Sequence, residues 1–353
     1  MSNAQNGHNR NGGLTLVPMP GFENLAKIVR GVIREKKNNP TPTDIALPKF
    51  GTRSSGEPFL RLPKRHIGGH DCVVLTSGPG TYKMVVETQM LLGYLAGRRA
   101  GRITLVTGYL PLSRSDKDEG EEELALTPLF VRFFQGAADN KLDRIIAVDL
   151  HSPQAVMAAK PGFITEVSLM RRQIDRAVET ELLNSDKLVI MYPDEGARKR
   201  YESQVTTTLE ASGIEQFPSV FGLKRRSSSK KSKTLELYGD LGALPSATVI
   251  CVDDEAATLG TLESTASIVL NRYNANRFCA VVIHPVLCGS GPKLLATDDC
   301  PISCLYATDT ILVNRPELDN LIASGKIIIQ KWAHDLANIV YHHHWDTSIR
   351  TTR

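Results

Sequence analysis

The residues best suited to chemistry lie in the stretch Val249–Thr261, which reads VICVDDEAATLGT. An apolar run of strand length ends in two adjacent acids, Asp253 and Asp254, and a short turn then leads into a helical pattern. Open α/β sheets build ligand sites at the carboxyl ends of their strands in this way. Two such acids can accept hydrogen bonds from sugar hydroxyls or hold a divalent metal. This turn is therefore the first candidate site.

The same turn contains groups that suit a phosphate. Thr258, Gly260 and Thr261 lie where the helix is expected to begin, and hydroxyls and free backbone amides at such a place can bind an anion. An ordinary strand-to-helix turn whose acids cap the helix would contain similar residues. The turn by itself does not decide between these two interpretations.

Two further strand ends carry side chains of the same kind. Asp149 and His151 follow an apolar strand that ends at Val148, and Asp194 follows another that ends at Tyr192. Ligands of open α/β sheets bind outside the carboxyl ends of the strands, so these groups can converge with the acids of the first turn. A single histidine after a strand is more often structural. The repetition at equivalent positions is what favours a metal–nucleotide site.

Basic residues gather in a few places. One group is Arg198–Arg200, and another is the serine–lysine segment Lys224–Lys233. A solvated surface loop explains most charge runs, whereas a basic loop can also close over a polyphosphate. Arg114, in the segment Leu110–Lys117, can bind a phosphate in a planar fork or be a surface arginine in a polar loop.

The composition is that of a globular protein not built around nucleic acid or a membrane. The 353 residues are 41% hydrophobic and 23% charged, and the net charge of +4 is a mild excess. No apolar run reaches the roughly 18 residues that span a bilayer, and the N-terminus has no signal-peptide pattern. The six cysteines lack metal-type spacing, which favours reduced thiols. We expect a cytoplasmic protein that binds neither nucleic acid nor membrane.

Strand-like and helix-like segments alternate along the chain, which predicts parallel sheets with right-handed crossovers. Eight strands over this length fit two doubly wound α/β domains better than one barrel. Residues 1–13 are polar and rich in glycine and asparagine, so we expect a disordered tail. The expected strands are 72–76, 103–107, 144–148, 188–192, 247–252, 280–283, 303–306 and 326–329, and the expected helices are 84–98, 127–138, 168–183, 262–274 and 316–323.

The polar and basic segments described above, taken in their order along the chain, resemble the ribose-phosphate pyrophosphokinase (PRPP synthetase) family over most of the chain. The resemblance implies two phosphoribosyltransferase-like doubly wound domains, each with a mainly parallel central sheet. We expect the N-terminal α/β domain at residues 14–168, with 317–353 packing back on it, and the C-terminal α/β domain, which carries the sugar-phosphate loop, at 169–316. The matching segments are Leu110–Lys117, Asp149–His151, Pro193–Gly196, Lys224–Arg226, Gly239–Asp240, Asp253–Thr261, Ile283–Pro285 and Thr308–Ile311.

The resemblance also implies a reaction and a role for each matching residue. A pyrophosphoryl group would move from ATP to the 1-hydroxyl of ribose 5-phosphate, giving PRPP and AMP, with Mg²⁺ as the cofactor. A homo-oligomer built from dimers, commonly a hexamer, is implied as well. The implied catalytic residues are Lys224 and Arg226, the ATP-binding residues are Arg114, Asp116 and Glu57, the sugar-phosphate residues are Asp253, Asp254, Thr258, Gly260 and Thr261, and the metal ligands are His151 and Asp194.

The sugar-phosphate loop departs from the family pattern, which reads roughly DD-x-x-DTGGT. Ala257 stands where the third acid is expected, and Leu259 stands where the first glycine is expected. Leu259 would add a side chain where the backbone should approach a phosphate closely. Two alternatives therefore stay open: the same chemistry on a variant acceptor such as ADP-ribose, and a non-catalytic subunit associated with a synthetase. A phosphoribosyltransferase would share the acidic loop but not the basic segment.

Overall fold

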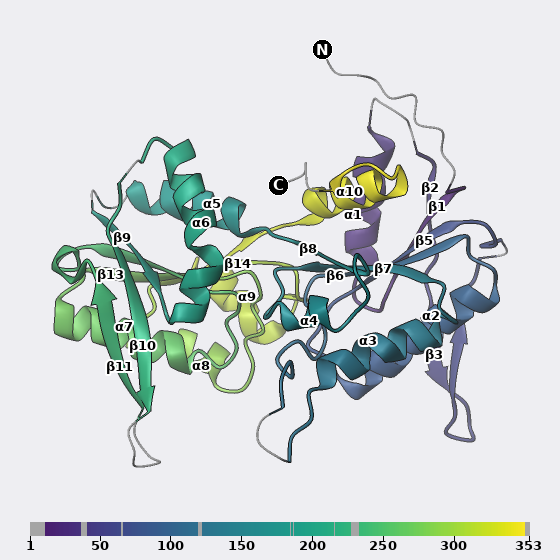
Figure 1. The fold of residues 1–353 in the computed structure, drawn as a ribbon, viewed down its shortest axis with the longest axis horizontal. Helices are drawn as coiled ribbons and strands as arrows, with labels where there is room; N and C mark the ends of the chain where they lie inside the picture. The colour runs from purple at the N-terminus through teal and green to yellow at the C-terminus, as the bar shows by residue number, and fades with distance from the viewer. Residues whose placement is uncertain are drawn as a thin grey trace. The chain divides into compact units, whose positions relative to one another are not determined.

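The computed structural model describes residues 11–36, 41–64, 66–118, 122–183, 185, 187–214, 216–226 and 233–349, and of residues 224–226 and 233–235 it describes the backbone alone. Strands and helices alternate through these residues and form two compact units (Figure 1). The first unit comprises Met1–Val167 together with Trp332–Arg353, and the second comprises Ser168–Lys331. Within the described residues, no helix combines the length and apolar character that a membrane span requires.

A six-stranded, all-parallel sheet in the order β2–β1–β5–β6–β7–β8 is the centre of the first unit as far as it is described. Helices cover it on both faces, with α1 and α10 on one face and α2 and α3 on the other (Figure 1). A separate antiparallel hairpin joins β3 (Lys49–Thr52) to β4 (Pro58–Arg61). The other elements are β1 (Leu14–Pro18), α1 (Glu23–Arg34), β2 (Thr43–Ile45), β5 (Asp71–Thr76), α2 (Tyr82–Gly97), β6 (Arg102–Thr107), α3 (Leu126–Ala137), β7 (Leu142–Val148), α4 (Gln154–Met157), β8 (Ile164–Val167) and α10 (Ala333–His344).

The second unit, over its described residues, contains a seven-stranded sheet in the order β11–β10–β9–β12–β13–β14–β15. Its neighbours pair in parallel except for the antiparallel pair β10–β11. Helices α5 and α6 lie on one face and α7 on the other (Figure 1). The elements are α5 (Met170–Leu182), β9 (Leu188–Tyr192), α6 (Glu195–Ala211), β10 (Ser219–Arg226), β11 (Lys233–Gly239), η1 (Leu241–Ala243), β12 (Thr248–Val252), α7 (Gly260–Tyr273), β13 (Arg277–Val281), α8 (Gly291–Leu295), β14 (Cys304–Thr308), α9 (Pro316–Ala323) and β15 (Ile327–Gln330).

These two units confirm the predicted fold class. The eight expected strands and five expected helices all occur, with ends within about three residues of the expected ones. The central strands are mainly apolar because both faces of each parallel sheet are covered. Every residue of β5 and of β12 is buried.

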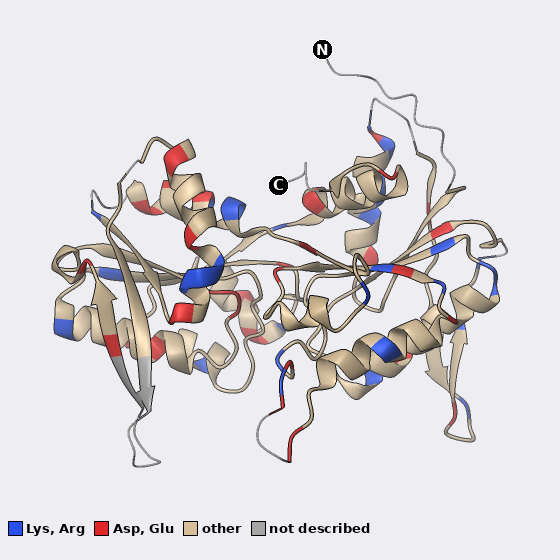
Figure 2. Cartoon of the chain, viewed as in Figure 1, with Lys and Arg blue, Asp and Glu red and all other residues tan. Residues whose placement is uncertain are grey.

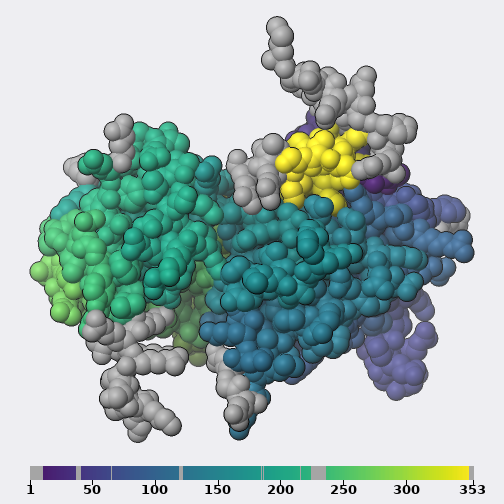
Figure 3. Space-filling view, in the orientation of Figure 1, coloured from purple at the N-terminus to yellow at the C-terminus, as the bar shows by residue number. Residues whose placement is uncertain are grey.

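The boundary that we expected at residue 316 lies at 331. Helix α9 and strand β15 belong to the second unit, because β15 pairs in parallel with β14 and so extends the second sheet. The return to the first unit begins only at Trp332. There α10, yellow in Figure 3, packs against α1.

The expected disordered tail lies outside the described residues up to residue 10, and its last part is attached to the first unit. Asn11 Nδ2 donates to the carbonyl oxygen of His344 over 2.7 Å, and the carbonyl oxygen of Gly13 accepts from the amide of Asp71 over 2.9 Å. These bonds anchor residues 11–13, so the ordered part of the unit begins earlier than expected.

A buried ionic network ties the C-terminal helix to the first sheet. The Asp71 carboxylate on β5 lies 2.6 Å from Arg102 Nη2 and 2.8 Å from His344 Nδ1. Burial would raise the pKa of Asp71, but hydrogen bonds from His344 and Arg102 outweigh burial and hold the pKa below its usual value. Removing either partner would leave a buried charge incompletely paired, which typically costs about 3–5 kcal/mol.

His343 makes the stability of this network depend on pH. Its Nε2 lies 2.8 Å from Thr104 Oγ1, and burial, followed by the charge of Arg102, lowers the pKa of His343 to about 4. An unfolded histidine titrates near pH 6.5, so between pH 6.5 and 4 the unfolded chain takes up a proton that the folded protein excludes. The stability present above pH 6.5 is lost as the pH falls, by about 3 kcal/mol in full.

We expect urea titrations to show this loss as a fall in the free energy of unfolding between pH 6.5 and 4. His343→Gln removes the titrating group and should make the fall shallower by about 3 kcal/mol. A variant whose pH dependence equals that of the wild type would contradict the assignment.

Candidate functional site

Acidic residues lie at the carboxyl ends of two neighbouring strands in the second unit. Strands β9 and β12 pair in parallel, with Met191 opposite Cys251, so both end at the same edge of the sheet. Asp194 follows β9 and caps α6, where its Oδ1 accepts from the amide of Ala197 over 3.0 Å. Asp253 follows β12 directly. The sheet register thus brings together acids that are far apart in the sequence.

The two acids after β12 have different surroundings. Asp254 is buried, and its Oδ2 lies 3.2 Å from Arg200 Nη1 on α6. Asp253 Oδ1 accepts from the amide of Asp254 over 2.9 Å. Burial, followed by repulsion from the carboxylates of Asp254 and Asp194, raises the pKa of Asp253 well above its usual value. A cation or a hydrogen-bond donor bound here would relieve that repulsion.

Arg200 also belongs to this edge, although we predicted no separate role for it. The only indication in the sequence was the basic cluster Arg198–Arg200, which is consistent with an anionic ligand in general. Figure 2 shows basic and acidic residues together on α6, where Arg198 pairs with Glu202 and Lys199 pairs with Glu195. Only Arg200 of the three reaches an acid of the loop after β12.

The turn after the two acids is braced by a second loop and opens toward solvent. The amides of Leu287 and Cys288 donate to the carbonyl oxygens of Ala256 and Ala257 over 2.8 and 3.1 Å. Thr258, Gly260 and Thr261 are exposed at the beginning of α7. Their position leaves hydroxyls and first-turn amides available to an anion.

Leu259 does not project into this open turn. Its side chain is 3% exposed and belongs to the hydrophobic core, while its backbone adopts the left-handed region with a φ of 68°. A non-glycine residue in that region carries a cost of about 1–2 kcal/mol. The expected intrusion of this side chain into the phosphate space is therefore corrected, because core packing directs it away.

Strand β10 carries the two basic residues past the end of β9. Phe221 pairs with Tyr192, the last residue of β9, so Lys224 and Arg226 lie three and five positions beyond that end. Their backbones pair with Leu235 and Lys233 of β11. The side chains of Lys224 and Arg226, and residues 227–232 of the expected basic loop, lie outside what the structure describes.

The first unit has a comparable edge at the ends of β5, β6 and β7. The loops after β5 and β6 are joined, since Ser77 Oγ accepts from the amide of Tyr109 over 2.8 Å and the amide of Gly78 donates back to Tyr109 over 2.8 Å. Arg114, exposed, and Asp116, half-buried, follow β6, and His151, half-buried, follows β7. The sheet order places these groups along one edge.

Glu57 lies elsewhere in the first unit. It occupies the turn between β3 and β4, where its carboxylate accepts from Ser55 Oγ over 3.0 Å and its carbonyl oxygen accepts from the amide of Arg53 over 2.8 Å. This hairpin is not part of the six-stranded sheet, so the sheet topology does not bring Glu57 to the edge with Arg114 and His151.

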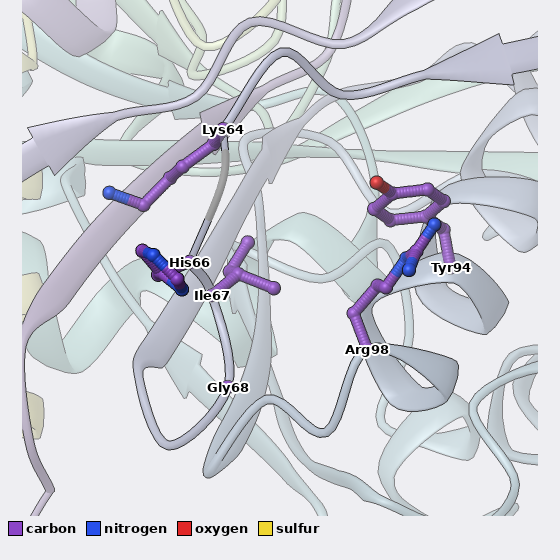
Figure 4. Close-up of a pocket in the computed structure, with 6 residues that line it drawn as sticks. All are labelled: Lys64, His66, Ile67, Gly68, Tyr94 and Arg98. Carbon is purple, nitrogen blue, oxygen red and sulfur yellow. The ribbon is translucent and has the colours of Figure 1, made fainter.

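A pocket of about 360 Å³ in the first unit lies apart from that edge (Figure 4). It is formed by the segment before β5 and the last part of α2, at the amino end of the strand. Arg98 lies over the ring of Tyr94, 5.3 Å from its centroid. The pocket is thus not part of the candidate site; its lining residues are Lys64, His66, Ile67, Gly68, Tyr94 and Arg98.

Comparisons with known proteins agree on one family name. No protein-family model matches the chain. The chain is 26% identical over 281 residues to the ribose-phosphate pyrophosphokinase of Deinococcus radiodurans, covering 79% of this chain and 81% of the relative. A relative of the same name from Aquifex aeolicus is 26% identical over 272 residues, covering 76% and 81%. Another from Bacillus subtilis is 26% identical over 267 residues, covering 73% and 75%.

The fold is similar to a solved structure of the same kind. The phosphoribosylpyrophosphate synthetase of Mycobacterium smegmatis superposes with a TM-score of 0.77, at 22% identity, over 95% of this chain and 99% of that chain. The relatives confirm the resemblance that the order of the motifs predicts: over most of its length the chain is similar to ribose-phosphate pyrophosphokinases.

Proposed function

We propose that this protein transfers a pyrophosphoryl group from ATP to the 1-hydroxyl of ribose 5-phosphate, giving PRPP and AMP. One observation carries the proposal: at a single edge of the second sheet, Asp194, the pair Asp253–Asp254 and an open helix-start turn lie beside the strand that bears Lys224 and Arg226. The name shared by the curated relatives supports the reaction type.

Magnesium fits the donors of this edge. Burial, followed by repulsion from neighbouring carboxylates, raises the pKa of Asp253, and a bound cation would offset both effects. Hard carboxylate oxygens are the ligands that Mg²⁺ prefers. We assign Asp194 as a metal ligand at this edge, in keeping with the resemblance. The resemblance implies the same role for His151 at the edge of the first unit. When bound, the metal neutralises charge on the phosphate oxygens.

The sugar phosphate would bind across the loop after β12. The carboxylates of Asp253 and Asp254 accept hydrogen bonds from the ribose hydroxyls, and the ion pair with Arg200 holds Asp254 in place. The hydroxyl of Thr258 and the amides of Gly260 and Thr261 bind the 5-phosphate at the start of α7. Ribose 5-phosphate offers both kinds of group, a vicinal diol and a terminal phosphate.

In the transfer, the 1-hydroxyl oxygen of the sugar attacks the β-phosphorus, and the bond from that phosphorus to the oxygen shared with the α-phosphate breaks. AMP leaves with the electron pair of that bond. Charge is spread over the oxygens of the transferring group, so catalysis depends on position and on positive charge. We assign the neutralisation of that charge to Lys224 and Arg226.

A variant acceptor is kept as a second candidate, because Ala257 places no carboxylate where the family pattern has its third acid. Since the side chain of Leu259 is buried in the core, the change at Ala257 is the one that bears on the acceptor. ADP-ribose, whose 5-phosphate carries a further group, would suit a less charged loop.

We further propose a homo-oligomer built from dimers, which light scattering on the purified protein would test.

The reaction is tested by assaying AMP after incubation with ATP, magnesium and either ribose 5-phosphate or ADP-ribose. We expect AMP from the wild type, and a rate lowered about a hundredfold or more in Lys224→Ala, because a donor aimed at transition-state charge is typically worth about 3–4 kcal/mol. Lys27→Ala, an exposed lysine on α1, is the matched control and should retain the wild-type rate. Absence of AMP with both acceptors would reject the enzyme and favour a non-catalytic subunit.

Ala257→Asp tests which acceptor the loop accommodates. A restored acid can accept one more hydrogen bond from the sugar, so we expect kcat/KM for ribose 5-phosphate to rise by up to about tenfold relative to ADP-ribose. Ala257→Asn, which is isosteric with aspartate and adds a polar group without charge, is the control. A fall in the ratio of the two kcat/KM values would refute the role of this position in acceptor choice.

Leu259→Gly should act mainly on stability. Glycine relieves the left-handed strain, but the lost leucine leaves a core cavity that costs more, so we expect the free energy of unfolding to fall by about 2 kcal/mol in urea titrations. A more stable Leu259→Gly protein would show that strain outweighs core packing at this position.

A further inference from the structure

Three buried hydroxyls at the strand ends of the first unit have no hydrogen-bond partner among the described residues. They are Thr76 Oγ1, at the end of β5, Ser113 Oγ, in the loop after β6, and Ser152 Oγ, in the loop after β7. Their residues are 2%, 2% and 8% exposed. Strands β5, β6 and β7 are neighbours, so each of three adjacent strand ends carries one such group.

Other hydroxyls in the same region do have hydrogen-bond partners. The hydroxyl of Ser77 accepts from the amide of Tyr109 over 2.8 Å, and the hydroxyl of Thr107 donates to the carbonyl oxygen of Tyr109 over 2.7 Å. Buried polar groups in native proteins are nearly always paired. The unpaired ones at this edge can therefore gain a hydrogen-bond partner that the described residues do not supply.

The two serines directly adjoin residues to which the proposed function gives a charged ligand. Ser113 precedes Arg114, whose guanidinium suits a phosphate, and Ser152 follows His151, the assigned metal ligand. Metal ions in phosphoryl transfer bridge the terminal phosphate oxygens. A hydroxyl beside either residue is thus placed near polyphosphate charge, and hydrogen bonds to charged acceptors are about twice as strong as neutral ones.

We infer that Ser113 and Ser152 donate their hydroxyl hydrogens to the polyphosphate of the bound nucleotide and are binding residues for it. The inference rests on the proposed function and adds two binding residues to it. The free protein bears the cost of two buried, unpaired hydroxyls, and the ligand removes that cost.

Loss of either serine hydroxyl should weaken ligand binding without lowering the stability of the free protein. Ser113→Ala and Ser152→Ala remove a hydroxyl that has no partner in the free protein, so the Tm without ligand should stay equal or rise. Calorimetry with magnesium and α,β-methylene-ATP, in which the bond to be broken is blocked, should show a Kd raised about tenfold in each variant. Inorganic tripolyphosphate with magnesium should show a similar factor, because the lost contact is to phosphate.

Two further variants serve as controls for the serine variants. Thr265→Val removes another buried, unpaired hydroxyl, on α7 of the second unit, and should change neither the Tm nor the Kd appreciably. Ser77→Ala removes a paired hydroxyl and should lower the Tm without ligand.

Several outcomes would overturn the inference. The first is an unchanged Kd in both serine variants. The second is a Tm without ligand that falls as it does in Ser77→Ala. The third is a Kd that is raised for the nucleotide analogue but unchanged for tripolyphosphate. A wild type that binds neither probe and releases no AMP rejects the proposed function together with this inference. A wild type that binds both, with serine variants equal to it, rejects the inference alone.

Discussion

The structure depends on one constraint: strands of a parallel sheet that is covered on both faces cannot carry exposed polar side chains until they end. All residues of β5 and of β12 are buried. Backbone amides and carbonyls satisfy one another within the ladder, and apolar side chains fill both faces. In such fully buried strands, charged groups are therefore confined to the ends, and parallel pairing gathers the carboxyl ends at one edge. The same constraint that forms the core thus assembles the candidate site.

The acidic turn in the second unit is held in place by its neighbour rather than by its own sequence. The amides of Ile283 and His284 donate to the carbonyl oxygen of Asp254 over 3.1 and 2.9 Å. His284 is itself buried, with Nδ1 3.0 Å from Thr310 Oγ1. The segments after β13 and β14 thus brace the acidic turn. At Leu259, the packing of the buried side chain offsets the strain of the left-handed backbone.

At the candidate edge of each sheet, some side chains have energetically unfavourable surroundings in the free protein. In the second unit, Asp253 is surrounded by carboxylates that raise its pKa. In the first unit, Ser113 and Ser152 are buried without partners among the described residues. Local rules of stability are typically violated at functional sites and compensated elsewhere. The buried network of Asp71, Arg102 and His344, far along the same strand from the edge, is one place where the first unit is firmly stabilised.

The sequence by itself determined the fold class, the eight apolar strands and the order of the motifs, because apolar runs and polar strand ends are local patterns. The expected strands did not include β1, β2, β3, β4, β8, β10 and β11. In β8, β10 and β11, polar residues interrupt the apolar strand pattern. Only the tertiary structure decided that β15 extends the second sheet, since strand pairing is non-local. It also decided that Leu259 packs into the core, that Arg200 reaches Asp254, and which hydroxyls are left unpaired. Burial and partners depend on neighbours distant in the chain, and no local pattern encodes them.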